Sequence, residues 1–401
     1  MPVKENGQIF LITVSGPDHP GITANLMKIA AASGDRILDM GQAVTHGLLS
    51  LSFVLEIKSV KDGHSPIVRD LLFKAKELGL EMDYKIIEKE DDIQETLTEN
   101  NFILNCVAVS EITPAFIRDV ATTLADHGIN IKRIDKVSPG EFTSLEVMTE
   151  VPAGIELKDT KMKLIDVSTN HRVDMAFIKD NVFRRSKRLI VFDMDSTLIQ
   201  TEVIDEIADE AGVGPQIREI TERAMNGEMD FDESLKARVS QLKGLKAEKL
   251  DEILNRLPLT PGVEDFIKTV KSLGYQVAVI SGGFTFFANA LKQRLGLDYA
   301  FANELEIING ELTGNITGTI VNAEQKALLV NLIAQQMNIS MEQVVAVGDG
   351  ANDLPMLSAA GLGIAFHAKD VVRREAEHQM SHGPMTSILY FLGIPGPKSI
   401  K

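Results

Sequence analysis

The chain has 401 residues, which is too long for a single hydrophobic core and predicts two or three domains. Its formal net charge of −16 opposes nonspecific binding to nucleic acid or to anionic membranes. No segment approaches the roughly eighteen uninterrupted apolar residues of a membrane span. We therefore expect a soluble globular protein that has neither a nucleic-acid partner nor a membrane partner.

The single cysteine, Cys106, excludes an internal disulfide framework and a Cys-rich zinc site. Its apolar neighbours indicate that the thiol packs in a core. The start of the chain, MPVKENGQIFLITVSG, contains an apolar run that is too short and too strand-like for a signal peptide. We therefore expect a cytoplasmic protein.

The first half of the chain contains an internal repeat. Residues 8–88 show the order strand, helix, strand, strand, helix, strand. A similar order returns after an acidic connector, EKEDDIQETLTEN, from FILNCVAV to RVDMAFI. The sequence therefore predicts two small βαββαβ domains, at residues 1–92 and 93–182.

The second half, residues 183–401, alternates short apolar runs (RLIVFD, YQVAVIS, QVVAVGD) with helical stretches. Strands without in/out alternation predict a parallel sheet covered on both faces, in a Rossmann-like α/β domain. Residues 203–257 contain no strand-like run and predict a helical cap over the carboxyl edge of that sheet, where such folds keep their sites. We interpret the basic cluster RRSKR, residues 184–188, as a solvated junction.

Polar residues stand at the ends of these strands and at one helix start. They are Asp193, Asp195, Ser281, Lys326, Asp349 and Asp353. Each Asp alone could equally be a turn former or a helix cap, but the set together favours one site at the sheet edge. Four carboxylates in a cleft repel one another unless cations offset them, which predicts Mg²⁺ with Lys326 as a second cation.

The segments DMDST and SGG, Lys326 and GDGAND resemble the four motifs of haloacid dehalogenase superfamily phosphatases, in order and in strand context. The resemblance extends from residue 188 to the C-terminus. It implies that Asp193 is a nucleophile that forms a phosphoaspartate, and that Asp195 is the general acid and base. These roles suit the residues, because a carboxylate can attack phosphorus when cations offset the repulsion.

The same resemblance assigns the metal and phosphate ligands. Mg²⁺ is expected to be held by the Asp193 carboxylate, the Asp195 backbone carbonyl and Asp349. Asp353 is expected to support the metal shell or Lys326. The expected contacts of the phosphoryl group and substrate are the Ser281 hydroxyl, the Gly282 amide, Lys326 and Asn352.

The segment MNGEMDFDESLKARVSQLKGL resembles the cap of phosphoserine phosphatases. The resemblance implies that Glu202 pairs with the substrate ammonium and Arg238 with its carboxylate, while Met225 and Phe231 shield the site from water. Arginine suits a planar carboxylate because its fork binds both oxygens, although Arg238 alone could also form a surface ion pair. We therefore expect hydrolysis of O-phospho-L-serine to serine and phosphate, the last step of serine biosynthesis.

The two N-terminal domains resemble ACT domains, which are regulatory modules in amino-acid metabolism. In SGPDHPGITANL, Asp18 could meet an ammonium and the amides from Gly21 onward a carboxylate, which makes serine a candidate effector. Pro20 and Gly21 could equally form only a turn and helix entry. The second copy has VSEITPAF instead, which favours a structural or dimerising role, and we expect a homodimer.

Three alternatives stay open at this point. The chain could act on another small phosphate ester or on a phosphoprotein, or it could be an ACT-based amino-acid sensor with a residual phosphatase fold. A kinase-like phosphotransferase is disfavoured because the chain contains neither a G-x-x-x-x-G-K-[ST] loop nor a kinase glycine loop.

Overall fold

The computed structural model describes residues 7–58, 65–87, 100–138, 143–225 and 228–394. The chain forms two compact units, Met1–Leu97 and Thr98–Lys401. Residues 88–99 of the acidic connector, with the predicted boundary at residues 92 and 93, lie outside the described residues. Among the helices described, none is long and apolar enough to span a lipid bilayer.

The first unit is one βαββαβ domain with an antiparallel sheet of order β2-β3-β1-β4. Helices α1 and α2 pack against one sheet face, where the alternate side chains of β1 and β3 are buried. The elements are β1 (Gln8–Pro17), α1 (Ile22–Ser33), β2 (Arg36–Thr45), β3 (Leu48–Ile57), α2 (Pro66–Glu77) and β4 (Glu81–Ile87).

The second unit begins with another βαββαβ domain, whose antiparallel strands take the order β8-β5-β7-β6. Cys106 is fully buried among the side chains of this domain, so the predicted core thiol is confirmed, and burial raises its pKa. The elements are β5 (Asn101–Ala108), α3 (Pro114–Asp126), β6 (Asn130–Lys136), β7 (Ser144–Glu150), α4 (Leu157–His171) and β8 (Val173–Lys179).

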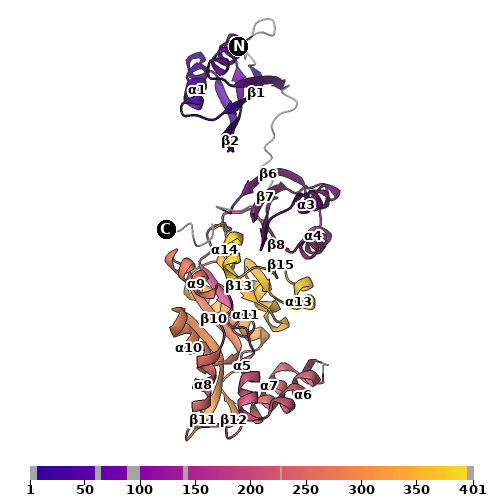
Figure 1. The fold of residues 1–401 in the computed structure, drawn as a ribbon, viewed down its shortest axis with the longest axis vertical. Coiled ribbons are helices and arrows are strands. Elements are labelled where there is room, and N and C mark those ends of the chain that lie inside the picture. The colour runs from indigo at the N-terminus through magenta and orange to yellow at the C-terminus, as the bar shows by residue number, and fades with distance from the viewer. Residues whose placement is uncertain (1–6, 59–64, 88–99, 139–142, 226–227, 395–401) are drawn as a thin grey trace, which may run out of the picture. The chain divides into compact units, whose positions relative to one another are not determined.

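The α/β part of the second unit is built on a sheet whose central strands are parallel and fully buried (Figure 1). The strands are β9 (Leu189–Phe192), β10 (Gln276–Phe284), β11 (Tyr299–Ile308), β12 (Glu311–Thr317), β13 (Val344–Gly348), β14 (Leu362–Phe366) and β15 (His378–Met380). The helices outside the cap are α9 (Val263–Ser272), α10 (Thr285–Leu295), α11 (Ala323–Gln336), α12 (Leu354–Ala359), α13 (Asp370–Glu375) and α14 (Ile388–Phe391).

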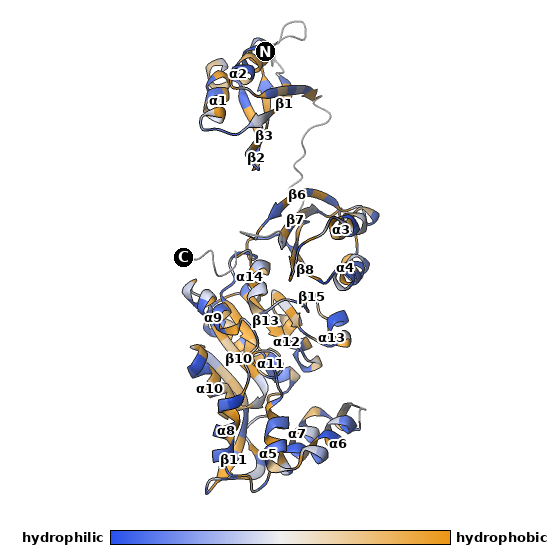
Figure 2. Ribbon diagram, in the orientation of Figure 1, coloured by the Kyte–Doolittle hydropathy of each residue, from blue (hydrophilic) through white to orange (hydrophobic). Residues whose placement is uncertain are grey.

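Helices cover both faces of this sheet. Alternate strand residues such as Ile190 and Phe192 pack with α9, α10 and α14, whereas Leu189 and Val191 pack with α11, α12 and α13. The central strands β10 and β13 are correspondingly mostly apolar in Figure 2. The cap consists of α5 (Val203–Ala211), α6 (Gly214–Met225), α7 (Phe231–Ser240) and α8 (Glu248–Arg256).

The antiparallel hairpin of β11 and β12 was not among the predicted elements. Its turn is Asn309-Gly310, with both residues at positive φ, which is the strongest short hairpin signal in a sequence. The hairpin supports the cap, because the amide of Gly244 donates to the Leu312 carbonyl (2.8 Å) and that of Leu312 to the Leu245 carbonyl (2.9 Å).

The second βαββαβ domain and the α/β sheet share one eleven-stranded sheet, because β8 pairs with β15 at Met175 and Gln379. The buried Asp174 carboxylate accepts from three successive amides of the loop after β15, at 2.6 to 3.1 Å. The predicted boundary at residues 182 and 183 falls inside this unit and stays a prediction.

The interpretation of residues 184–188 as a solvated junction is wrong for two of its side chains. Arg184 is 3% exposed and pairs with Glu146 of β7, and Lys187 is also 3% exposed. The Lys187 ammonium donates to the Glu342 carbonyl at 2.5 Å, and burial lowers its pKa to about 8. The cluster therefore joins the two sheet halves internally, because its long side chains reach partners that are distant in the sequence.

Buried His378 in β15 predicts an acid-dependent loss of stability. Burial lowers its pKa to about 3 in the folded chain, against about 6.5 when unfolded. The unfolded state therefore binds more protons below pH 6.5, and the free energy of unfolding falls as pH decreases toward 3. Between pH 6.5 and 5.0 we expect His378 to cost about 2 kcal/mol.

The measurement is urea unfolding of wild type and His378→Asn at these two pH values. The carboxylates are common to both proteins, so the difference between their losses isolates His378. We expect wild type to lose about 2 kcal/mol more than the variant; equal losses would contradict the assignment.

Candidate active site

The carboxyl ends of two neighbouring parallel strands bring the first acidic residues together. Asp193 follows β9 and Asp349 follows β13, and the Asp193 amide donates to the Val347 carbonyl at 2.9 Å. Because the strands run in the same direction, both side chains emerge at one sheet edge. The sequence prediction of convergence at this edge is confirmed for these two residues.

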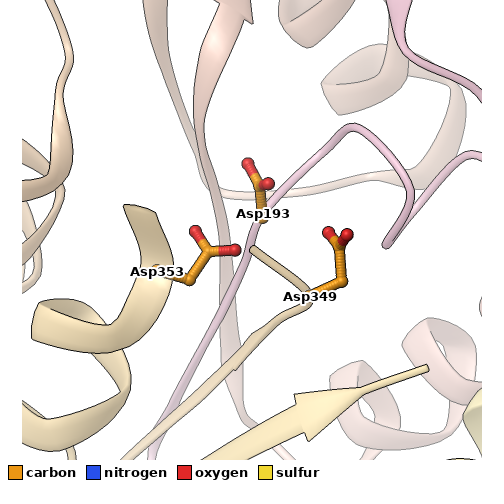
Figure 3. Close-up of side chains that lie close together, drawn as sticks. All are labelled: Asp193, Asp349 and Asp353. Carbon is orange, nitrogen blue, oxygen red and sulfur yellow. The ribbon is translucent and has the colours of Figure 1, made fainter. Parts of the chain in front are cut away.

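Carboxylate oxygens of Asp193, Asp349 and Asp353 lie within 4.8 Å of one another, and Figure 3 shows the three side chains close together. Lys326, in the first turns of α11, is fully buried, and its ammonium donates to Asp193 Oδ1 and to Asp353 Oδ1, both at 2.7 Å. Asp353 also accepts from the Gly350 amide at 3.0 Å. Asp353 therefore orients Lys326 and the loop after β13.

The titration of this cluster is governed by burial and by its excess of negative charge. Burial, followed by repulsion from Asp353, raises the pKa of Asp193 and takes that of Asp349 to about 7. Burial alone would lower the pKa of Lys326, but Asp193 and Asp353 outweigh it and raise that pKa. One ammonium cannot offset all these carboxylates, and their oxygens suit a divalent cation such as Mg²⁺.

Asp195 is held in a fixed orientation beside this cluster. Its Oδ1 accepts from the Val203 amide at 2.8 Å, and its Oδ2 accepts from the Ser281 hydroxyl at 3.1 Å. Burial, followed by repulsion from Glu202, raises the pKa of Asp195 to about 7. A carboxyl group with this pKa can donate a proton and later accept one near neutral pH.

The backbone of β10 approaches the site closely at its end. A Cβ atom on Gly283 would lie 2.5 Å from Asp195 Oδ2, so this position has no room for a side chain. A Cβ atom on Gly282 would lie 3.1 Å from Phe231 Cζ, which is a tight contact. The hydroxyl of Ser281 donates to Asp195 and accepts from the Gly283 amide at 2.8 Å. Its expected contact with a phosphoryl group stays a prediction.

A cavity of about 440 Å³ opens between the sheet edge and the cap. Phe231, at the start of α7, lines it together with Met229. The structure describes Met225 as the last residue of α6 but not the placement of its side chain. The other predicted site residues that line the cavity are Asp193, Asp195, Glu202, Arg238, Gly282, Asp349 and Asn352.

Arg238 of α7 and Glu202, which directly precedes α5, line the same cavity. Glu202 precedes α5 and accepts from the Ser196 hydroxyl at 3.0 Å, and Arg238 Nε donates to the Ser234 carbonyl at 3.4 Å. Burial lowers the pKa of Arg238, while Glu202 and Asp205 act in the opposite direction. The cavity therefore presents a guanidinium and a carboxylate opposite the acidic cluster.

Several residues of the site were not predicted. Thr197 donates to Asp349 Oδ1 at 3.2 Å, and Met229 lines the cavity. Asp205 is near enough to Arg238 for the two opposite charges to attract each other. Thr197 lies inside the DMDST motif, so its place beside the acidic residues was the available signal. For Asp205 and Met229 the sequence offers only their positions within the cap segment.

The predicted effector loop of the first unit lies between β1 and α1. Asp18 and Gly21 are both exposed, and the Asp18 amide donates to the Gly47 carbonyl at 2.8 Å. Gly21 has φ 97° and begins the helix without a side-chain cap. A non-glycine residue at this φ would be strained, so Gly21 serves the chain entry into α1 in any case.

Three protein families match successive parts of the chain. The haloacid dehalogenase-like hydrolase family matches residues 187–361, and ACT domain families match residues 8–85 and 106–178. These matches confirm the predicted α/β fold class with two N-terminal βαββαβ domains. Hydrolases of this fold generally use Mg²⁺, which agrees with the acidic cluster.

Relatives match almost the whole length of the chain. It is 40% identical over 398 residues to phosphoserine phosphatase SerB2 of Mycobacterium tuberculosis, covering 98% of this chain and 94% of that protein. Phosphoserine phosphatase of Streptomyces coelicolor is 40% identical over 389 residues, covering 96% and 92%. The crystal structure of an unliganded probable phosphoserine phosphatase from Vibrio cholerae has a TM-score of 0.60 and 38% identity, covering 75% of this chain and 88% of that chain. The chain therefore belongs to the phosphoserine phosphatase family of haloacid dehalogenase-like hydrolases and carries two ACT domains.

Proposed function

We propose that the protein is a phosphoserine phosphatase that hydrolyses O-phospho-L-serine to L-serine and phosphate, the last step of serine biosynthesis. The observation that carries the proposal is one cavity lined by Asp193, Glu202 and Arg238. The carboxylate nucleophile Asp193 therefore lies in the same cavity as two groups that suit the serine part of the substrate. Glu202 can pair with its ammonium, and the Arg238 guanidinium can bind both oxygens of its carboxylate. The names of the relatives point to the same reaction.

In the first step, an Asp193 oxygen attacks phosphorus while the bond between phosphorus and the serine oxygen breaks. Asp195 donates its proton to that oxygen, so serine leaves as a neutral alcohol. The raised pKa of Asp195, about 7, keeps a large share of it protonated for this task at neutral pH. Lys326 and the Gly282 amide stabilise charge on the transferring group.

In the second step, water attacks the phosphorus of the phosphoaspartate and the bond to Asp193 breaks. Asp195, now ionised, takes the proton of that water, which releases inorganic phosphate and restores both carboxyl groups. Phe231 lies over Gly282 and limits the entry of other water molecules while the substrate is bound.

Mg²⁺ is the proposed cofactor, and the residues fit it. The Asp193 carboxylate, the Asp195 backbone carbonyl and Asp349 would hold the ion, while Asp353 fixes Lys326. When bound, the ion supplies positive charge that offsets the repulsion between Asp193 and the phosphate.

A substrate panel tests the proposed specificity. Phosphoethanolamine retains the ammonium and lacks the carboxylate, whereas phosphoglycolate retains a carboxylate and lacks the ammonium. We expect kcat/KM for O-phospho-L-serine to exceed both by about 100-fold, because each lost charge leaves Arg238 or Glu202 unpaired. Equal rates on the three esters would instead indicate a general phosphatase.

We propose a division into domains at residues 1–92, 93–182 and 183–401, which the family matches support. We also propose that the enzyme is cytoplasmic.

The ACT domains are proposed to regulate the enzyme by binding an amino acid. We propose serine as this effector, bound through the Asp18 carboxylate and the amides from Gly21 onward. Asp18→Ala in the full chain is expected to weaken inhibition by serine several-fold at unchanged kcat. An unchanged inhibition curve would remove this loop from regulation.

A homodimer through strand β2 is also proposed. This edge strand is exposed along its whole length and carries Ile37, Met40 and Val44, each more than a third exposed. An exposed apolar edge favours pairing with a second copy. We expect Val44→Lys to convert the dimer to monomer in sedimentation velocity and Tyr84→Lys, on the opposite edge, to leave it intact. A monomeric wild type would contradict the proposal.

A further inference from the structure

Strand β10 leaves its regular pairing with β11 where it reaches the active site. Ile280 pairs with Phe301, but the next pair is Phe284 with Asn303, so three residues of β10 stand opposite one of β11. These three residues are Ser281, Gly282 and Gly283, the segment that presses against Asp195 and Phe231. The bulge directs this backbone toward the cavity and interrupts its regular ladder of hydrogen bonds.

The side chain of Asn303 bonds the bulge. Asn303 is fully buried, and its Nδ2 donates to the Gly282 carbonyl at 2.7 Å. Its Oδ1 accepts from the Val321 amide at 2.8 Å. A carbonyl requires a donor and an amide requires an acceptor, so these two partners fix the orientation of the Asn303 side chain.

The second partner connects Asn303 to Lys326. Val321 precedes Asn322, whose side chain caps α11 by accepting from the Gln325 amide at 3.1 Å. Lys326 follows in the same helix and donates to Asp193. One buried amide thus joins two segments that face the phosphate position: the β10 bulge and the start of α11.

The chemistry of both bonds requires asparagine among side chains of this size. An aspartate keeps the acceptor for Val321 but places an anion against the Gly282 carbonyl, and a leucine fills the space without either bond. In a buried position, either change leaves polar backbone groups without partners. The Asn303 side chain therefore fills space and also supplies the hydrogen bonds that these two backbone groups need.

We propose that Asn303 is a positioning residue for phosphoryl transfer, which fixes the positions of the Gly282 amide and Lys326 relative to each other on the two sides of the phosphate site. The inference rests on the proposed phosphatase function. Asn303 touches no substrate; it acts through Gly282 and α11. Recognition of the serine moiety depends on Glu202 and Arg238, which Asn303 does not contact, so the phosphate and serine parts of the site separate in an experiment.

The test compares Asn303→Leu and Asn303→Asp with wild type and with the control Asn331→Ala. Asn331 donates within α11, to the Ala327 carbonyl at 2.9 Å. The readouts are kcat and KM for O-phospho-L-serine, the inhibition constants of inorganic phosphate and of L-serine in the presence of Mg²⁺, and the thermal unfolding midpoint. Inhibition by L-serine is measured with every protein carrying Asp18→Ala, so that it reports on the active site and not on the proposed effector loop.

For both Asn303 variants we expect kcat to fall about 10- to 100-fold, because a displacement of about 1 Å in a positioned group costs this much. The inhibition constant of phosphate should rise about tenfold and that of L-serine should stay within about twofold. Asn331→Ala should match wild type in every readout. If Asn303→Leu does not fold, the nearly isosteric Asn303→Asp decides the outcome.

The proposal is overturned if Asn303→Leu, or in its place Asn303→Asp, keeps both kcat and phosphate inhibition within about twofold of wild type. Parallel weakening of phosphate and serine would overturn it as well, because that pattern indicates a general loss of structure. A wild type that releases no phosphate from phosphoserine would contradict the proposed function. Calorimetric binding of inorganic phosphate, which needs no turnover, would then still decide the role of Asn303.

Discussion

Asp193→Asn is expected to lower kcat for O-phospho-L-serine by at least about 10⁴-fold, because the amide cannot form the phosphoaspartate. The substitution removes one buried carboxylate that lies 2.7 Å from the Lys326 ammonium and next to Asp349. It keeps the size and shape of the side chain, so the fold should persist. The loss therefore reports on chemistry rather than on packing.

The measurement is steady-state phosphate release, with circular dichroism to confirm the fold. Asp265→Asn, at an exposed carboxylate of α9, is the matched control and should retain wild-type kcat. Turnover by Asp193→Asn within about tenfold of wild type would mean that another group, or water directly, attacks phosphorus.

Arg238→Ala is expected to lower kcat/KM for phosphoserine about 100-fold while changing it less than about threefold for phosphoethanolamine, which has no carboxylate. Arg238 lines the cavity from α7, and burial lowers its pKa, so its charge is poorly satisfied by water. A substrate carboxylate would provide the missing partner. Arg238→Lys should recover only part of the loss, because an ammonium lacks the planar fork.

The same kinetics distinguish specificity from damage. The control Arg256→Ala removes another cap arginine, which is exposed and pairs with Glu206 and Glu210 of α5. It should leave both substrates unaffected, since surface pairs contribute little. An equal fractional loss on phosphoserine and phosphoethanolamine in Arg238→Ala would show that the residue supports the cap and does not read the carboxylate.

The sequence predicts the acidic centre well because its chemistry is local. Asp193 and Asp349 directly follow apolar strands, and parallel strands ending at one edge leave few other places for them. The cap helices were also visible, because residues 203–257 lack strand-like runs. Lys326 could be placed because it follows closely after Asn322, a helix N-cap.

Features that depend on distant register could not be predicted. Nothing near Asn303 indicates that its amide will meet Gly282 and Val321, because the contact exists only once β10 bulges against β11. Asp174 likewise finds its three amides only because β8 pairs with β15. The interpretation of Arg184 was wrong, since a basic cluster is usually solvated and the partner of this buried side chain, Glu146, is far away in the sequence.

Phosphate release from O-phospho-L-serine by the purified full chain is the most direct test of the central claim. It should be measured with Mg²⁺ and again after removal of divalent ions with EDTA. We predict rapid turnover with Mg²⁺, with kcat/KM of at least about 10⁴ M⁻¹s⁻¹, and near-background rates after EDTA. Absence of phosphate release with Mg²⁺, or an unchanged rate after EDTA, would contradict a metal-dependent phosphoserine phosphatase.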